Sequence, residues 1–286
     1  MTKLCVGLLS YCDSKAYPKR FEIFKKCLEG LKLIADEDVY IYALDNGSSE
    51  DVFNLLKNSP HISAVYKSRE NLFDVLAVNL LVRKAKEIGA KYVMHLEDDL
   101  LFYDNRNFLE SCIDILEKNK DCGYVRILKY DFNNKEMYDK FSNHPKKDTG
   151  NYQRHYNNIT KAPLVWSNAV TWGNFNFYMT NWHWYNYPNI CRLDVLEKII
   201  PKDDCYPMMH LEGEMMKKYN DLQLFTCVMD LGVVSHITGK DTSIRILQKA
   251  CLKKEFPLIA IEKINKEIEY FLGKENSLRI FFGKIA

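Results

Sequence analysis

Three consecutive carboxylates follow one apolar run and carry the clearest chemical signal in the sequence. Residues 92–96 are apolar apart from one histidine, Glu97, Asp98 and Asp99 follow, and hydrophobicity resumes at Leu100. Such a run is typical of a buried strand. Three acids at a strand end repel one another and lose hydration, so they require compensation. A divalent cation that holds a diphosphate would provide it, because carboxylate oxygens suit Mg²⁺ and Mn²⁺. On this segment alone, a strand-end turn whose acids face water is an equally good interpretation.

Polar segments also follow the first two predicted strands. Residues 4–9 form one predicted strand and precede the polar segment 10–13. Residues 39–44 form the next and precede the segment 45–49, which is rich in turn-forming residues. In α/β sheets, ligands bind beyond the carboxyl ends of the strands. We therefore expect both polar segments and residues 97–99 to share one rim of a sheet.

Strand-like and helix-like segments alternate through the first 130 residues. The clearest helix, residues 72–88, has apolar residues at intervals of three and four. Strict alternation predicts an α/β fold with a mostly parallel sheet flanked by helices. The predicted strands are 4–9, 39–44, 62–66, 92–96 and 124–128, and the predicted helices are 18–34, 51–56, 72–88 and 108–116.

The pattern changes in the second half of the chain. Residues 131–163 are polar and indicate a long loop or lid. Residues 164–190 are dense in aromatic side chains, which fit either a core hairpin or an aromatic-lined groove for a sugar; we favour a mixture in which core predominates. Residues 241–286 read as helices that cover one side of the sheet or join a partner.

Composition excludes several classes of protein. The 286 residues carry a formal net charge of +2, without the basic footprint of a nucleic-acid binder. The nine cysteines are scattered and never spaced as C-x-x-C, which argues against a zinc framework or a secreted disulfide scaffold. No apolar stretch is long enough for a transmembrane segment, and no signal-peptide pattern is present. We expect a cytoplasmic protein with at most weak affinity for membrane surfaces.

Two motifs together resemble a known family. The segment LDNGSSED at residues 44–51, followed about fifty residues later by HLEDD at residues 95–99, resembles GT-A-fold glycosyltransferases, and most of all family 2. Members of that family use nucleotide-diphosphate sugars. The resemblance implies a Rossmann-like GT-A domain over residues 1–240, with a nucleotide-sugar half at 1–130 and an acceptor half at 131–240. Residues 241–286 would be a C-terminal helical extension.

The resemblance also implies a donor site. Asp45 would hold the nucleoside with Asn46 nearby, Asp98 would address the ribose, and Asp99 would bind the metal, Mn²⁺ or Mg²⁺. Glu97 replaces what is commonly an aspartate. The residues assigned to the nucleotide sugar are Ser10, Tyr11, Asp45, Asn46, Arg69, Glu97, Asp98 and Lys240.

Downstream segments are similar to the acceptor side and the catalytic base of the family. Residues 189–192 look like an acceptor-side loop, and the helix 193–199 follows it. Residues 210–219 resemble the segment that carries the base, but Gly213 interrupts the usual acidic pair. Glu212 and Glu214 are therefore rivals, and Glu212 fits the family's spacing better. Positions two apart on a helix point to different sides, so only one of them can face the reaction.

A histidine after an apolar run completes the implied site. His236 ends a predicted strand, as does the metal-binding histidine of many GT-A enzymes, whereas a lone histidine elsewhere is usually structural. Lys240 fits either a diphosphate contact or an ordinary surface lysine.

The implied function is metal-dependent transfer of a sugar to a hydroxyl of a glycan or glycoconjugate, with inversion and a glutamate general base. A retaining GT-A enzyme is an open alternative. A nucleotidyltransferase acting on sugar phosphates is another, although residues 7–20 contain only Gly7 in place of a glycine-rich loop. An inactive carbohydrate-binding domain is the non-enzymatic alternative.

Overall fold

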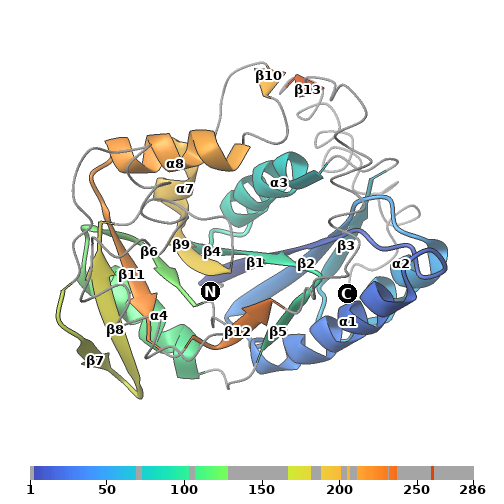
Figure 1. Cartoon of the computed structure of the whole chain (residues 1–286), viewed down its shortest axis with the longest axis horizontal. Coiled ribbons are helices and arrows are strands. Elements are labelled where there is room, and N and C mark those ends of the chain that lie inside the picture. Colours follow the sequence, from blue (N-terminus) through green and yellow to red (C-terminus); the bar gives the residue numbers. More distant parts are fainter. Residues whose placement is uncertain are drawn as a thin grey trace, which may run out of the picture.

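The protein has a mixed α/β fold in which helices cover both faces of one large sheet (Figure 1). The computed structural model describes residues 3–68, 73–102, 107–127, 167–181, 188–200, 205–206, 211–230, 232–236 and 259–260. Within these residues the large sheet has nine strands in the order β3-β2-β1-β4-β9-β6-β11-β8-β7. All of them run in one direction except β9 and β8. The predicted α/β class with a mostly parallel sheet is confirmed.

The strands agree closely with the sequence pattern in the first half of the chain. The strands of the large sheet are β1 (Leu4–Ser10), β2 (Val39–Asp45), β3 (Ala64–Lys67), β4 (Tyr92–Glu97), β6 (Cys122–Arg126), β7 (Val170–Trp172), β8 (Phe175–Thr180), β9 (Asn189–Arg192) and β11 (Phe225–Met229). Residues 189–192, which the resemblance assigns to a loop, are instead the central strand β9, paired with β4 and β6. That expectation is wrong, because Ile190 and Cys191 are fully buried and complete the sheet.

The helices fall into two layers. They are α1 (Pro18–Gly30), α2 (Glu50–Asn58), α3 (Phe73–Glu87), α4 (Asn107–Lys118), α7 (Leu193–Ile199) and α8 (Leu211–Asp221), with a short 3₁₀ turn at Leu31–Leu33. Side chains of α1, α2 and α4 belong to one hydrophobic core, and those of α3, α7 and α8 to the other. Figure 1 shows these two groups on opposite faces of the sheet. The predicted helix 18–34 ends at Gly30 and continues only as the 3₁₀ turn.

Alternation along each strand sends neighbouring residues to different cores. On β1, Leu4, Val6 and Leu8 pack on the α1 side, and Cys5 packs on the α3 side. Both faces of the central strands are covered, so they read as nearly continuous apolar runs. Polar residues are left for the strand ends, which is where the candidate site lies.

Two small antiparallel pairs flank the large sheet. Strand β5 (Leu100–Phe102) pairs with β12 (Val234–His236), and β10 (Cys205–Tyr206) pairs with β13 (Ile259–Ala260). The helical prediction for residues 241–286 is wrong at 259–260, where a strand forms instead. The remainder of that segment and all of 131–163 lie outside the described residues, so the domain division stays a prediction.

The aromatic segment includes a hairpin at the edge of the sheet. Strands β7 and β8 pair with each other, and β8 also pairs with β11. Phe177 is 2% exposed, whereas Val170 at the outer edge is 47% exposed. A hairpin is confirmed for residues 167–181, but only Phe177 and Thr180 are buried in it, so the expectation that core predominates is wrong for these residues. The rest of the aromatic segment, apart from β9, falls largely outside the described residues.

Two expectations drawn from composition can be compared with the fold. No helix in the described part of the chain has both the length and the apolar character that crossing a bilayer demands. Seven cysteines are free and buried, where they act as small apolar side chains (Cys5, Cys12, Cys27, Cys112, Cys122, Cys191 and Cys227).

Candidate functional site

The carboxyl ends of β1, β2 and β4 meet at one rim of the sheet. Ser10 lies opposite Asp45 in the β1–β2 register, and Leu9 lies opposite Glu97 in the β1–β4 register. The Asn46 N–H donates to the Ser10 carbonyl at 2.8 Å, which joins the first two strand ends. The predicted convergence of the three polar segments is confirmed.

The turn after β2 is held by its own polar side chains. The Asp45 carboxylate accepts a hydrogen bond from the Ser48 N–H at 2.8 Å, and the Ser48 hydroxyl accepts one from the Cys12 N–H at 3.0 Å. Asp45 is fully buried, and this burial raises the pKa of its carboxyl above the ordinary value. The Asp45 side chain therefore orders the loops that border the rim, and its nucleoside contact stays a prediction.

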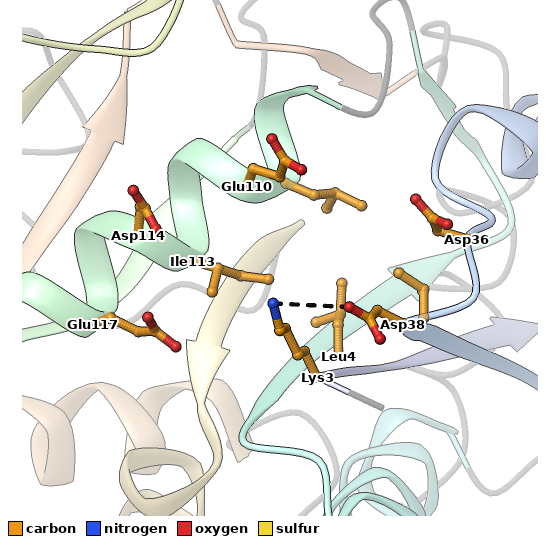
Figure 2. A pocket seen from close by; sticks show the side chains of 10 residues that line it. Lys3, Leu4, Asp36, Asp38, Glu110, Ile113, Asp114 and Glu117 are labelled. Atoms are coloured by element: carbon orange, nitrogen blue, oxygen red, sulfur yellow. Dashed lines mark ion pairs between the residues drawn. The ribbon is translucent and has the colours of Figure 1, made fainter. Parts of the chain in front are cut away.

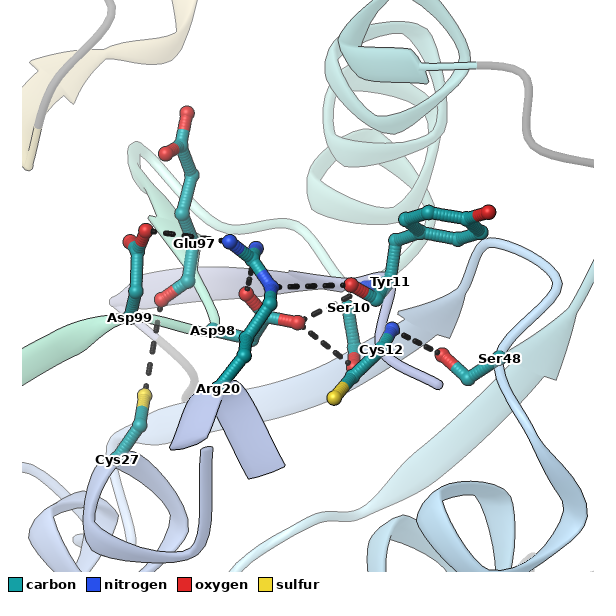
Figure 3. Close-up of polar contacts among 9 residues, drawn as sticks. All are labelled: Ser10, Tyr11, Cys12, Arg20, Cys27, Ser48, Glu97, Asp98 and Asp99. Carbon is teal, nitrogen blue, oxygen red and sulfur yellow. Dashed lines mark hydrogen bonds and ion pairs between the residues drawn. The ribbon is translucent and has the colours of Figure 1, made fainter. Parts of the chain in front are cut away.

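Asp98 lies at the centre of a hydrogen-bond network (Figure 3). One carboxylate oxygen accepts hydrogen bonds from the Ser10 hydroxyl at 3.2 Å and the Tyr11 N–H at 2.9 Å. The other accepts one from the Arg20 guanidinium at 2.5 Å. Burial raises the pKa of Asp98 to about 6, although Arg20 opposes that rise. The three donors fix the carboxylate of Asp98 between β1 and α1.

Arg20 is a site residue that the sequence reasoning missed. It is 12% exposed, its Nε donates to the Tyr11 carbonyl at 3.2 Å, and its Nη1 lies 3.7 Å from Asp99 Oδ2. Arg20 therefore supplies part of the compensation that the sequence analysis assigned to a metal cation alone. In the sequence it follows Lys19 in the first turn of a helix, and nothing in that pattern separates a buried guanidinium from a surface lysine.

Removing the guanidinium should destabilise the protein strongly. We expect Arg20→Met to lower the free energy of unfolding by about 3–5 kcal/mol, because it leaves the buried Asp98 carboxylate without its cation. Urea denaturation at neutral pH measures the change. Lys19→Met is the matched control, since Lys19 is the exposed neighbour on the same helix. A loss below about 1 kcal/mol, the scale of an exposed ion pair, would contradict this role for Arg20.

Glu97 is separated from the two aspartates. Figure 3 shows its side chain pointing away from Asp98 and Arg20. Its carbonyl oxygen accepts a weak hydrogen bond from the Cys27 thiol at 3.6 Å, on the α1 side. Alternation along β4 puts Glu97 on the same face as His95, the face covered by α3, α7 and α8.

The β5–β12 pair brings His236 to the rim. In this antiparallel register His236 lies directly opposite Leu100, the residue after Asp99. The Cα atoms of directly opposed residues are about 4.5–5.5 Å apart. The backbone of His236 is thus adjacent to the acidic segment. Its imidazole lies outside what the structure describes, so ligation by His236 stays a prediction.

Helix α8 carries the two candidate bases. Glu214 is 34% exposed and forms an ion pair with Lys217 at 3.0 Å. Tyr219 is buried, and position 212 lies seven residues before it, so both positions share one helix face. That face packs on the sheet, because the Tyr219 hydroxyl donates to the Phe225 carbonyl at 2.7 Å. The choice of Glu212 over Glu214 as the base stays a prediction.

The predicted metal ligands fit a divalent cation in type and in backbone placement. Carboxylate oxygen and imidazole nitrogen are both ligands that Mn²⁺ accepts, and Asp99 immediately precedes β5, which pairs with the strand β12 that ends at His236. Among residues whose side chains are described, no three His, Cys, Asp or Glu side chains gather around one point. Arg69 and Lys240 lie outside the described residues, and their contacts with the diphosphate or base stay predictions.

A cavity at the opposite edge of the sheet is not part of this rim (Figure 2). It has a volume of about 330 Å³ and lies at the amino ends of β1 and β2, beside α4. Lys3 is the only basic side chain in its lining and pairs with Asp38 at 3.8 Å. The acidic lining residues are Asp36, Asp38, Glu110, Asp114 and Glu117. A cavity at the amino ends of parallel strands lies away from the edge where α/β sheets bind ligands.

His95 is the second polar residue that sequence reasoning did not assign to a role. It is 6% exposed, and neither ring nitrogen has a hydrogen-bond partner among the described residues. Burial lowers the pKa of His95 to about 4. The folded protein therefore holds this imidazole in its neutral form across the neutral and mildly acidic range.

The depressed pKa of His95 predicts a pH effect on stability. The unfolded chain binds a proton near pH 6.5 and the folded chain only near pH 4. Between these values the unfolded state holds more protons, so stability falls as pH falls. At pH 4.5 His95 should lower the free energy of unfolding by about 2–3 kcal/mol relative to pH 7.5. Urea denaturation at both pH values measures this loss of unfolding free energy. We expect the His95 contribution to be absent in His95→Gln and retained in the His61→Gln control. An equal loss in both variants would contradict the assignment to His95.

Comparisons with known proteins add similar structures but no family. No protein-family model matches the sequence, and the search of curated proteins gives no match. A cytidylyltransferase from Leptospira borgpetersenii serovar Hardjo-bovis (strain JB197) is 13% identical over 74% of this chain and 68% of that chain, with a TM-score of 0.38. The mannosyltransferase PcManGT from Pyrobaculum calidifontis, solved in complex with GDP-Man and Mn²⁺, is 13% identical over 96% and 71%, with a TM-score of 0.46. S. aureus TarS 1–349 is 12% identical over 98% and 73%, with a TM-score of 0.47. At these identities and TM-scores the similar structures do not indicate a function for this chain.

Proposed function

We propose that this chain is a GT-A-fold glycosyltransferase that transfers a sugar from a nucleotide-diphosphate sugar to a hydroxyl of a glycan or glycoconjugate. The observation that supports it best is the β5–β12 register, which sets His236 opposite the residue after Asp99 at the carboxyl edge of the sheet. The backbone positions of Asp99 and His236, which are far apart in the sequence, are thereby close to the rim formed by Ser10, Asp45 and Glu97.

The donor would lie along this rim. Asp99 and His236 would hold Mn²⁺ or Mg²⁺, which when bound supplies Lewis-acid stabilisation of the departing diphosphate. Asp98 is already engaged by three donors, so its main contribution would be to hold Asp99 and the loop after β1 in position. Asp45 and Asn46 would contact the nucleoside, together with Arg69, which follows β3 in the sequence.

The acceptor hydroxyl must lose its proton as it attacks the sugar. We assign this proton to Glu212, because position 212 shares the sheet-facing side of α8, whereas Glu214 pairs with Lys217 near solvent. A hydroxyl that enters opposite the leaving diphosphate inverts the anomeric centre. The proposal is therefore an inverting hexosyl- or pentosyltransferase with a glutamate base.

A thermal-shift screen of nucleotide-diphosphate sugars, with Mn²⁺ and with EDTA, tests the class. We expect one nucleotide to raise the Tm selectively and only with the metal, since a ligand at 100 times its Kd stabilises the folded state by about 2.7 kcal/mol. Nucleoside triphosphates with sugar phosphates form the comparison set. Selective stabilisation by a triphosphate, or by no nucleotide at all, would overturn the proposal.

A further inference from the structure

Arg20 contacts both aspartates of the rim, but it holds them unequally. Its Nη2 donates to Asp98 Oδ1 at 2.5 Å, and its Nε donates to the Tyr11 carbonyl at 3.2 Å. Its Nη1 lies 3.7 Å from Asp99 Oδ2, which is within the range of an ion pair but too long for a hydrogen bond. Asp98 and Tyr11 therefore fix the guanidinium (Figure 3), and its contact with Asp99 is electrostatic.

The end of the guanidinium that faces Asp99 is shielded from water. Arg20 is 12% exposed and both aspartates are 1% exposed. The Nη1 atom is buried and has no hydrogen-bond acceptor among the described residues. Burial opposes the charge of Arg20, but Asp98 and Asp99 outweigh it and raise the pKa of the guanidinium above its ordinary value. A fixed positive charge therefore faces Asp99 throughout the neutral pH range.

The charge of this cluster is partly balanced before any metal binds. When both carboxylates are ionised, Asp98, Asp99 and Arg20 together carry one net negative charge. A divalent cation bound to Asp99 without other partners would leave one net positive charge in a buried place, beside a guanidinium that Asp98 holds there. Repulsion between like charges is stronger in such a place than in water. A diphosphate brings negative charge that offsets both cations.

We propose that Arg20 makes metal binding depend on the diphosphate of the nucleotide, because its guanidinium neutralises the aspartates in the nucleotide-free protein and repels a metal ion that arrives alone. Arg20 is then a positioning residue that acts through Asp98 and Asp99. The coupling is reciprocal, so the metal raises nucleotide affinity by the same factor by which the nucleotide raises metal affinity. The inference rests on the proposed function, since it takes Asp99 as a metal ligand.

Titration of the full chain with Mn²⁺, followed by the EPR signal of the free ion, tests this coupling. The titration is made without nucleotide and with saturating UDP, GDP, CDP or ADP in turn. We expect one nucleotide to tighten Mn²⁺ binding to the wild type by about tenfold or more. Arg20→Met should bind Mn²⁺ alone about tenfold or more tightly than the wild type does, and should lose a similar factor of the gain from nucleotide.

Matched variants separate charge from structure. Arg20→Lys keeps the positive charge, so its affinity for Mn²⁺ alone should stay within about threefold of the wild type. Lys19→Met, on the exposed neighbour, should behave as the wild type does. Adding Asp99→Asn to Arg20→Met should abolish the tightened binding, which locates the ion at Asp99.

A measurement on the wild type keeps the test decisive if Arg20→Met fails to fold. The probe is the ¹H–¹⁵Nε correlation of Arg20 in NMR spectra, assigned by its loss in Arg20→Lys. Mg²⁺ at a concentration that saturates the nucleotide-bound protein should leave this signal in place when added alone, and should shift it when added with the nucleotide. An equal shift by Mg²⁺ alone would overturn the inference.

The remaining outcomes distinguish the inference from the proposed function. The inference is overturned if folded Arg20→Met binds Mn²⁺ alone as the wild type does, or if the wild type binds Mn²⁺ equally well with and without every nucleotide. It is also overturned if the tightened binding survives Asp99→Asn. A wild-type protein that binds no Mn²⁺ with any nucleotide contradicts the proposed function itself, and the inference with it.

Discussion

Replacing Asp99 with asparagine should abolish metal-dependent donor binding and lower kcat/KM by about 10³-fold. A bound metal contributes several kcal/mol to transition-state stabilisation, and each 1.4 kcal/mol corresponds to about a tenfold change in rate. Asp99 is 1% exposed and lies 3.7 Å from Arg20. Asparagine has the same shape and volume as aspartate, but it lacks the negative charge that would attract the metal ion and the Arg20 guanidinium.

Calorimetric titration of the nucleotide with and without Mn²⁺ measures the effect. Asp13→Asn is the matched control, because Asp13 is a partly exposed carboxylate after the same strand β1. A correctly folded Asp99→Asn protein that binds nucleotide with unchanged metal dependence would show that the cation is held elsewhere.

Replacing Glu212 with glutamine should lower kcat by about 10²–10⁴-fold and leave donor affinity nearly unchanged. That range is the usual contribution of a positioned general base. Glutamine preserves the shape of the side chain but cannot accept the proton of the acceptor hydroxyl. Steady-state kinetics at saturating donor, together with direct measurement of donor affinity, separate the two effects.

Glu214→Gln is the control, because Glu214 pairs with Lys217 on the more exposed side of α8. Its activity should stay within a few-fold of the wild type. The reverse result, with Glu214→Gln inactive and Glu212→Gln active, would reassign the base. Activity in both variants would favour a retaining reaction, which the anomeric configuration of the product by NMR identifies.

The sheet could be predicted because its residues obey local rules. Strands buried on both faces are continuous apolar runs, and β1, β2 and β4 therefore stand out in the sequence. The carboxyl ends of such strands share one rim, which is why the positions of Ser10, Asp45 and Glu97 could be inferred without coordinates.

What escaped prediction depends on contacts between distant segments. Strand β5 is three residues long and exists through its pairing with β12, more than one hundred residues away. Arg20 acts through a carboxylate on another element, and its own neighbourhood in the sequence is that of a surface helix. Asn189 precedes a short apolar pair that looks like a loop until β4 and β6 are placed on either side of it.

The convergence of Asp99 and His236 on one cation is the central claim, and pulsed EPR of Mn²⁺ bound with the nucleotide measures it directly. Electron spin echo modulation should show ¹⁴N coupling from a directly bound imidazole in the wild type and in His95→Gln, and the coupling should vanish in His236→Gln. Absence of that coupling in the wild type, or its survival in His236→Gln, would contradict the site.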